Sequence, residues 1–297
     1  MAAFEPPSAA ERERAIGSTN GLPVSLCRAF RPTGFAPMTK PGPNDWLAMH
    51  RESGQTFEQF TRANPNRPDT QRNKIYLLPL GSFPEKRSPP LITLRDYAAA
   101  FFGMEVEVLP AVPIDFKSTT TRTNQYTQKR QLLTSDILTG LQQKLPKDAF
   151  CLLGITMEDL YPDPTWNFVF GQASLQERVG VYSFVRYDPS FYGQPPGTND
   201  EKLILRRSCD VLTHETGHMF GMPHCIYFNC LMAGSNHLQE SDARPMHLCP
   251  VCLRKLHFSV ELDITERYRR LKACCNKMGF KDESAWITDR LKQITAP

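Results

Sequence analysis

The sequence lacks three features that would place it in specialised classes of protein. Nowhere does it approach the roughly 18 consecutive apolar residues of a membrane-spanning helix. Its first 23 residues carry prolines and a charge cluster where a secretory signal peptide needs an apolar core. The net charge of +4, from 35 basic and 31 acidic residues, is too small and too dispersed for a nucleic-acid surface. We therefore expect an intracellular protein, in the cytoplasm, the nucleus or both, that binds neither membranes nor nucleic acid.

The remaining composition is ordinary except for its cysteines. At 297 residues, with 40% hydrophobic and 22% charged content, the chain can form one large globular domain or two modest ones. It has nine cysteines, an odd number, and four of them are paired at spacings typical of metal sites. In a chain without a secretory signal, this pattern favours metal binding over a disulfide framework.

The pattern of apolar residues divides the chain into two regions. Residues 1–72 are rich in proline and predict an irregular lead-in with one helix near 46–60. Residues 73–297 predict strands alternating with helices, which indicates an α/β fold with a twisted, mixed and mostly parallel sheet. The predicted strands are 74–81, 104–114, 149–156, 167–174 and 179–187; the predicted helices are 94–103, 128–145, 203–220 and 263–271.

Two histidines that could bind a metal ion lie inside the predicted helix 203–220. His214-Glu215-Thr216-Gly217-His218 has the H-E-x-x-H pattern. Residues four apart share one face of a helix, so both imidazoles can bind one zinc ion. Glu215 projects from the adjoining face, where it can serve as a general base without binding the metal.

A third histidine follows after a break in the helix. In a continued helix, His224 would lie roughly 15 Å along the axis from His214, out of reach of the same ion. Gly221 is suited to end the helix, and Pro223 prevents its continuation. The chain must therefore turn, and His224 becomes the candidate third ligand.

Four cysteines predict a second zinc site. Four residues lie between Cys225 and Cys230, two lie between Cys249 and Cys252, and eighteen lie between the two pairs. This spacing is typical of a closed structural zinc site with four thiolates. Two alternatives stay open: four buried cysteines without a metal, or a contact of Cys225 with the first zinc ion.

The stretch HETGHMFGMPHCIYFNCLMAGSNH, followed by RPMHLCPVCLRKL, resembles the archaemetzincins, a family of the metzincin metalloproteases. DAFCLLGITMEDLYP and WNFVFGQAS are also similar to that family. The resemblance implies an α+β metzincin-like fold with a catalytic domain over 73–297. The sheet and active-site helix would occupy 73–221. A smaller, zinc-stapled part with the methionine turn at Met232 and a C-terminal helix would occupy 222–297.

These observations predict a zinc metallopeptidase with two zinc ions, one catalytic and one structural. Zinc and Glu215 would activate water for attack on a peptide or protein substrate. The resemblance further implies action on small peptides or exposed N-termini, and substrate pairing along the edge strand 167–174. Simple core strands are the alternative for 167–187. We expect a monomer.

Two other functions compete with this one. The chain could be a zinc-binding interaction protein with little protease activity, although its intact ligands and general base argue against this. A nucleic-acid module built on the four cysteines, with Arg254 and Lys255 as phosphate contacts, has too few basic residues. His237 could lie near a catalytic cleft, but a structural role is favoured; Glu240, Asp242 and Arg244 predict a local ion-pair cluster.

Overall fold

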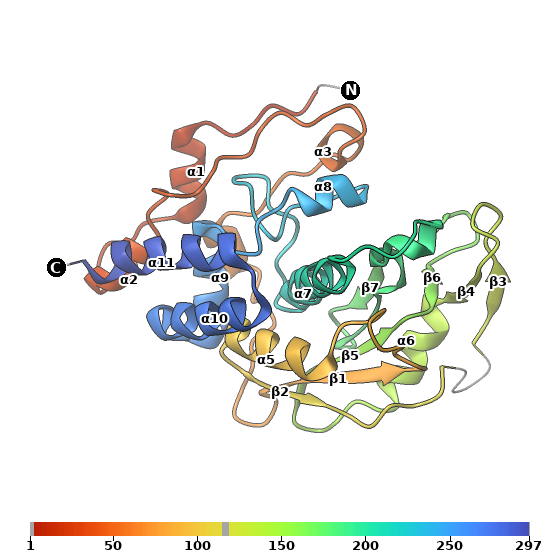
Figure 1. The fold of residues 1–297 in the computed structure, drawn as a ribbon. Helices are drawn as coiled ribbons and strands as arrows, with labels where there is room; N and C mark the ends of the chain where they lie inside the picture. Colours follow the sequence, from red (N-terminus) through yellow and green to blue (C-terminus); the bar gives the residue numbers. More distant parts are fainter. Residues whose placement is uncertain (1–2, 115–118, 297) are drawn as a thin grey trace. The chain divides into compact units, whose positions relative to one another are not determined.

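The computed structural model describes residues 3–114 and 119–296, which form two compact units (Figure 1). The sheet unit comprises 67–99, 104–114 and 119–219. The helical unit comprises 3–66, 100–103 and 220–296. Within the described residues, no helix is both long and apolar enough to span a membrane.

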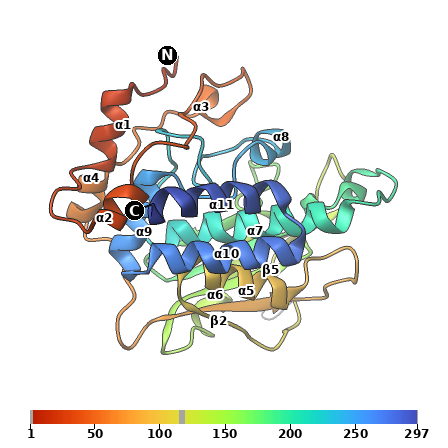
Figure 2. The same ribbon diagram turned by 60° about the vertical axis from the view of Figure 1, so that its left-hand side comes forward.

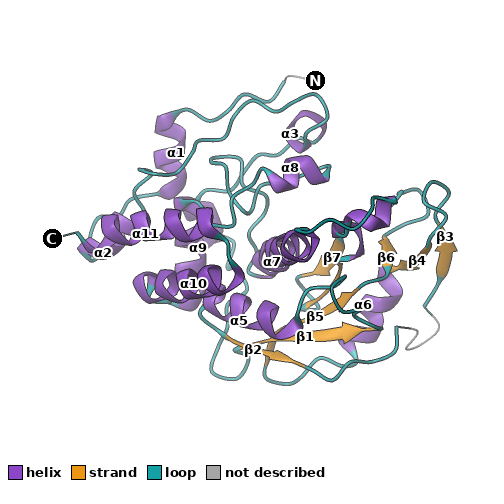
Figure 3. Ribbon diagram, in the orientation of Figure 1, coloured by secondary structure: helices purple, strands orange, loops and turns teal. Residues whose placement is uncertain are grey.

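All named strands belong to the sheet unit. Figure 3 draws the strands as orange arrows. Five form a sheet of order β2-β1-β5-β8-β7, in which only the edge strand β7 is antiparallel to its neighbour. Three more form a small sheet of order β3-β4-β6. The predicted mixed α/β fold with a mostly parallel sheet is thus confirmed. The strands are β1 Lys74–Leu80, β2 Glu105–Val108, β3 Thr121–Thr123, β4 Arg130–Leu133, β5 Ala149–Thr156, β6 Asp159–Tyr161, β7 Gly171–Ser174 and β8 Val179–Ser183.

Helices cover both faces of the five-stranded sheet. Val179 and Val181 of β8 share a buried cluster with Leu138 and Leu141 of α6 (Thr134–Gln142). Because successive strand residues point to opposite faces, the intervening Gly180 and the next residue, Tyr182, face the other side. There α7 (Asp200–Met219) packs against β7 and β8. The unit also contains the first part of α5 (Leu91–Phe102) and two short 3-10 helices, Val185–Tyr187 and Pro189–Tyr192.

The predicted helix 128–145 is wrong in its first part. Residues 130–133 form β4 instead, which pairs with β3 on one side and with β6 on the other. Helix α6 begins only at Thr134. The apolar spacing of Ile137 and Leu141 is therefore helical as predicted, but long-range strand pairing overrides the local pattern upstream of it.

A buried ion pair joins β6 to the segment after β8. Arg186 donates from Nε and Nη2 to the two carboxylate oxygens of Asp159, at 2.7 and 2.8 Å. Gln131 of β4 donates to the same carboxylate at 2.8 Å. Both charged side chains are buried. Each one compensates the charge of the other, because burying either charge alone would cost much free energy.

We expect Asp159→Ala to lower the free energy of unfolding by about 3–5 kcal/mol, because it leaves the Arg186 guanidinium buried without its counter-charge. Urea denaturation followed by tryptophan fluorescence measures the loss. The double variant Asp159→Leu/Arg186→Met, which removes both charges, should recover much of it. Equal losses in the single and double variants would contradict this assignment.

The helical unit contains eight complete helices in its described residues and the last turn of α5. Helices α10 and α11 run side by side (Figure 2) and pack on each other, and α11 also packs on α2. Asp263 caps α10 by accepting from Thr265 N and Glu266 N. The helices are α1 Ala9–Ile16, α2 Val24–Ala29, α3 Trp46–Met49, α4 Phe57–Arg62, α8 Leu238–Asp242, α9 Pro250–Val260, α10 Ile264–Met278 and α11 Lys281–Thr295.

The single helix predicted near 46–60 is split into α3 and α4. His50 adopts an extended conformation, and Gly54 has φ +67°, which a residue with a side chain rarely adopts. A Cβ on Gly54 would also lie 2.7 Å from Ile226 Cγ1. The loop between α3 and α4 therefore packs closely on the segment after His224, and this packing interrupts the predicted helix.

Buried cationic side chains fasten the lead-in to the C-terminal helices. Arg254 donates to the carbonyls of Ile16 and Ser18, both at 2.6 Å, and Lys255 donates to the carbonyl of Gln55 at 2.6 Å. Both side chains are buried. These two residues are thus occupied in holding the fold and do not form a phosphate-binding surface.

Candidate metal centres

Two histidines converge on the C-terminal half of α7. His214 Nε2 and His218 Nε2 lie 3.1 Å apart, with their rings nearly perpendicular. Two nitrogens bound to one tetrahedral zinc ion at about 2.05 Å would lie roughly 3.4 Å apart. The helix thus brings the two predicted ligands to a separation that fits a shared ion.

Glu215 lies between these histidines on α7 and is half-buried. Its charge acts on Tyr182 of β8, a fully buried residue beneath the helix. Burial first, and then the negative charge of Glu215, raise the pKa of Tyr182 well above its ordinary value. Tyr182 therefore stays a neutral phenol at neutral pH.

His224 follows the end of α7, after Gly221 with φ +81°. Its ring Nδ1 lies 2.9 Å from Glu52 Oε1. Trp46 Nε1 donates to the same oxygen at 2.9 Å, and the Trp46 ring meets the His224 ring edge-on. His224, Glu52 and Trp46 all belong to the helical unit, whereas His214 and His218 belong to the sheet unit.

The four predicted cysteine ligands form one buried cluster within the helical unit. The sulfurs of Cys225, Cys230, Cys249 and Cys252 all lie within 4.8 Å of one another, and those of Cys225 and Cys249 are 3.6 Å apart. Sulfurs bound to one tetrahedral zinc ion at about 2.3 Å would be roughly 3.8 Å apart, and a disulfide needs about 2.05 Å. All four thiols are free, so the geometry fits a closed metal site.

Proton energetics also favour a cation at this cluster. Hydrogen bonds from Cys230, Cys249 and Cys252 lower the pKa of Cys225 well below its usual range. Burial raises the pKa of Cys249, and hydrogen bonding to Cys225 raises that of Cys252. Burial and hydrogen bonding to Cys225 thus oppose ionisation of Cys249 and Cys252, and repulsion from a Cys225 thiolate adds to this. A divalent cation would remove this conflict.

Met232, the residue of the expected methionine turn, is fully buried next to the cysteine cluster. Its carbonyl accepts from Cys225 N at 2.8 Å, and its own N–H points to Cys230 Sγ at 3.4 Å. Arg244 donates to the carbonyl of Ala233, the next residue. A backbone hydrogen bond therefore joins the turn to Cys225, the residue that directly follows His224.

His237 has the structural role favoured by its sequence context. Its Nδ1 accepts from Glu240 N at 3.1 Å and so caps α8, and its Nε2 lies 3.1 Å from Asp45 Oδ1. Glu240 in turn accepts from the backbone of Trp46 and Asn236. These bonds join residues near α3 to the α8 segment.

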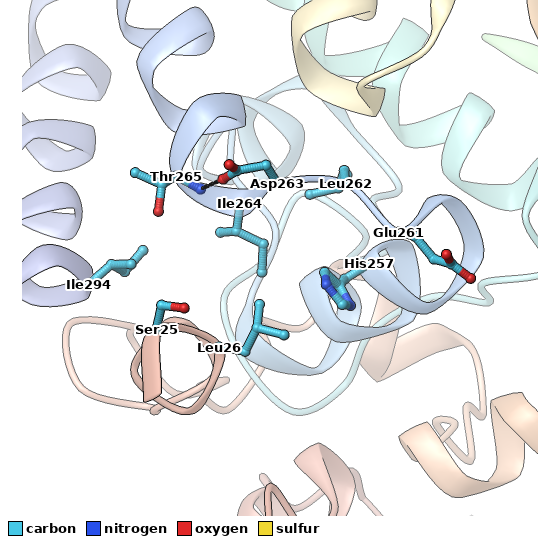
Figure 4. A pocket seen from close by; sticks show the side chains of 9 residues that line it. All are labelled: Ser25, Leu26, His257, Glu261, Leu262, Asp263, Ile264, Thr265 and Ile294. Atoms are coloured by element: carbon cyan, nitrogen blue, oxygen red, sulfur yellow. Dashed lines mark hydrogen bonds between the residues drawn. The ribbon is translucent and has the colours of Figure 1, made fainter. Parts of the chain in front are cut away.

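One further cavity lies in the helical unit (Figure 4). Its volume is about 330 Å³, and its lining includes none of the predicted ligands. His257 borders it, and burial lowers the pKa of this histidine, which keeps the ring neutral at pH 7. The lining residues are Ser25, Leu26, His257, Glu261, Leu262, Asp263, Ile264, Thr265 and Ile294.

Comparison with known proteins now identifies the family. The profile of Peptidase family M54 matches residues 107–258. Over 273 residues the chain is 43% identical to archaemetzincin-2 of Macaca fascicularis, covering 82% of this chain and 76% of that protein. The chain belongs to peptidase family M54, the archaemetzincins. It is thus a zinc metallopeptidase by family, and the resemblance to the archaemetzincins carried by its histidine and cysteine motifs is confirmed.

A more distant archaemetzincin agrees with this membership, and a solved structure shares the fold. Archaemetzincin-1 of Mus musculus is 33% identical over 278 residues, which cover 84% of this chain and 55% of that protein. A solved zinc-dependent peptidase from Methanocorpusculum labreanum has the same fold, with a TM-score of 0.50 at 23% identity, covering 61% of this chain and 99% of that one.

Sequence reasoning did not identify Glu52 and Trp46 as neighbours of His224. They lie 172 and 178 residues before it in a segment that predicts an irregular lead-in. Neither belongs to a ligand motif, and no periodicity links them to the active-site helix. Only the folded helical unit brings them to the His224 ring.

Proposed function

We propose that this archaemetzincin hydrolyses peptide bonds at a zinc ion bound by His214, His218 and His224. The observation that carries the proposal is the 3.1 Å separation of the His214 and His218 nitrogens on α7. Only five residues lie between His218 and His224. Gly221, with its left-handed backbone conformation, and Pro223 redirect the chain between them. His224 is therefore the natural third ligand, and three neutral ligands leave one position for water.

Glu215 is the general base of the proposed reaction. When bound, zinc polarises the scissile carbonyl and makes water more acidic. Glu215 takes a proton from the attacking water and passes it to the leaving amine. Its place in the sequence between the two histidine ligands supports a carboxylate that is close to the metal without being a ligand, and the neutral Tyr182 does not compete for the proton.

The four-cysteine cluster is proposed to hold a second, structural zinc ion. Four buried ligands leave no open position, so this ion would take no part in catalysis. Cys225 directly follows His224, and its N–H binds the Met232 carbonyl. The second zinc ion would therefore fix the chain on which the third catalytic ligand is mounted.

Strand β7 is proposed to bind the substrate backbone. It is the edge strand of the five-stranded sheet, with β8 as its inner neighbour, and it packs against α7. An extended peptide can add to such an edge through backbone hydrogen bonds, with little demand on side-chain identity. This mode suits short peptides, including those with free N-termini.

Zinc content and peptide digestion together test the proposal. We expect two zinc ions per chain by elemental analysis, and cleavage of members of a mixed peptide library. One zinc ion in the intact protein would contradict the two-site assignment. Two zinc ions without any cleavage would instead favour the alternative of a zinc-binding interaction protein.

A further inference from the structure

The catalytic ligand His224 has a carboxylate partner from the far N-terminal part of the chain. Glu52 Oε1 lies 2.9 Å from His224 Nδ1, and both side chains are about one-fifth exposed. An ionised carboxylate can only accept hydrogen bonds. Nδ1 must therefore carry the proton and donate it to Glu52, which leaves the lone pair of Nε2 for a metal.

Trp46 holds the Glu52 carboxylate in this position. Its indole Nε1 donates to the same Oε1 atom at 2.9 Å, and its ring lies edge-on against the His224 ring with centroids 4.8 Å apart. The Trp46 backbone N–H is itself bound by the Glu240 carboxylate at 2.9 Å. The carboxylate is thus oriented before any metal binds, so little entropy is lost on binding.

The loop that carries Glu52 is clamped at its other end as well. Gly54 packs so closely on Ile226 that a Cβ would lie 2.7 Å from Ile226 Cγ1. Lys255 donates to the carbonyl of Gln55 at 2.6 Å. These contacts fix residues 54 and 55 against the segment that follows His224, so Glu52 cannot easily move away from its ring.

We propose that Glu52 is a positioning residue for the catalytic zinc: it fixes the Nδ1–H tautomer of His224 and presents Nε2 to the metal. The inference rests on the proposed function, because it takes His224 as a zinc ligand. Carboxylates that accept from the second nitrogen of a zinc-bound histidine orient the ring and raise its basicity. The lead-in would thus complete the metal centre, in addition to covering the C-terminal helices.

Zinc affinity of the full chain tests this role. Glu52→Ala should weaken binding at one of the two zinc sites by roughly 10- to 100-fold in a chelator competition, with the four-cysteine site as an unchanged internal reference. Glu52→Gln should lose less, because its amide oxygen still accepts from Nδ1. The matched control is Glu58→Gln, since Glu58 is an exposed residue of the same segment paired with Arg62.

A spectroscopic measurement separates positioning from general stability. In the zinc-loaded chain with ¹⁵N-labelled histidine, the Nδ1–H of His224 should resonate far downfield and exchange slowly with water. His224→Gln identifies the signal by its loss. In Glu52→Ala this proton should exchange at least tenfold faster, while the ring protons of His214 and His218 stay unchanged.

Two results would overturn the inference, and only one of them would also overturn the proposed function. If His224→Gln loses one zinc ion but Glu52→Ala keeps wild-type affinity and proton exchange, Glu52 does not position His224 and the proposed function stands. If His224→Gln retains both zinc ions, the third ligand is misassigned and the proposed metal centre fails together with the role of Glu52.

Discussion

Replacing Glu215 by glutamine is expected to lower kcat for peptide hydrolysis by roughly 10²- to 10⁴-fold, the usual contribution of a general base. Glutamine has the same size and can still occupy the half-buried position on α7. It cannot accept a proton from water at neutral pH. Because Glu215 is not a ligand in the proposed centre, the variant should keep both zinc ions, and KM should change little.

The measurement is steady-state cleavage of a fluorogenic peptide, paired with zinc analysis of the same sample. His218→Ala is the comparison: it should lose both activity and one zinc ion. Glu201→Gln, on the exposed first turn of the same helix, is the matched control and should behave as wild type. Normal turnover by Glu215→Gln would remove Glu215 from the mechanism.

Segments with one strong local signal could be predicted from the sequence. Strand β5 coincides residue for residue with the predicted apolar run 149–156, because every one of its residues is buried in the middle of a parallel sheet. Helix α7 begins at Asp200, three residues before its predicted start. Its first turn is polar and stabilised by the helix dipole, so hydrophobic periodicity does not reveal it.

Elements that depend on distant partners could not be predicted in this way. Strand β4 exists because Gln131 pairs with Asp159 and Leu133 with Tyr161, each 28 residues away. Its four residues fit a helical pattern equally well. The edge position of β7 likewise follows from the order of the strands in the sheet, which local sequence patterns do not reveal.

The same distinction divides the residues of the candidate centres. His214, His218, His224 and the four cysteines carry fixed local spacings, and zinc chemistry gives those spacings a meaning. Glu52 has no such spacing, since it meets His224 across 172 residues. A residue that hydrogen-bonds to a metal ligand has to lie next to the second ring nitrogen of that ligand in the folded chain. It can therefore be identified only from the three-dimensional structure.

The largest effect on stability is expected for Cys249→Ser. The binding free energy of a structural zinc ion is about 10–16 kcal/mol in small zinc-dependent folds, and it is coupled to folding. Cys249 is fully buried, its Sγ lies 3.6 Å from that of Cys225, and it immediately precedes α9. A serine there is a poor zinc ligand, and the three remaining thiols are buried without a complete ligand set. We expect the variant to lose one zinc ion and to unfold at least 10 °C lower, which corresponds to about 3–5 kcal/mol or more.

Thermal unfolding by circular dichroism, with zinc analysis before heating, measures both losses. The matched control is Cys274→Ser, a half-buried cysteine on α10 in the same unit but outside the four-cysteine cluster, which should keep two zinc ions and a wild-type midpoint. Activity of Cys249→Ser below its midpoint is informative, because Cys225 adjoins His224. If the cysteine zinc holds the third ligand in place, kcat should fall even where the chain remains folded. A variant with one zinc ion and wild-type stability would show that the four cysteines do not staple the fold.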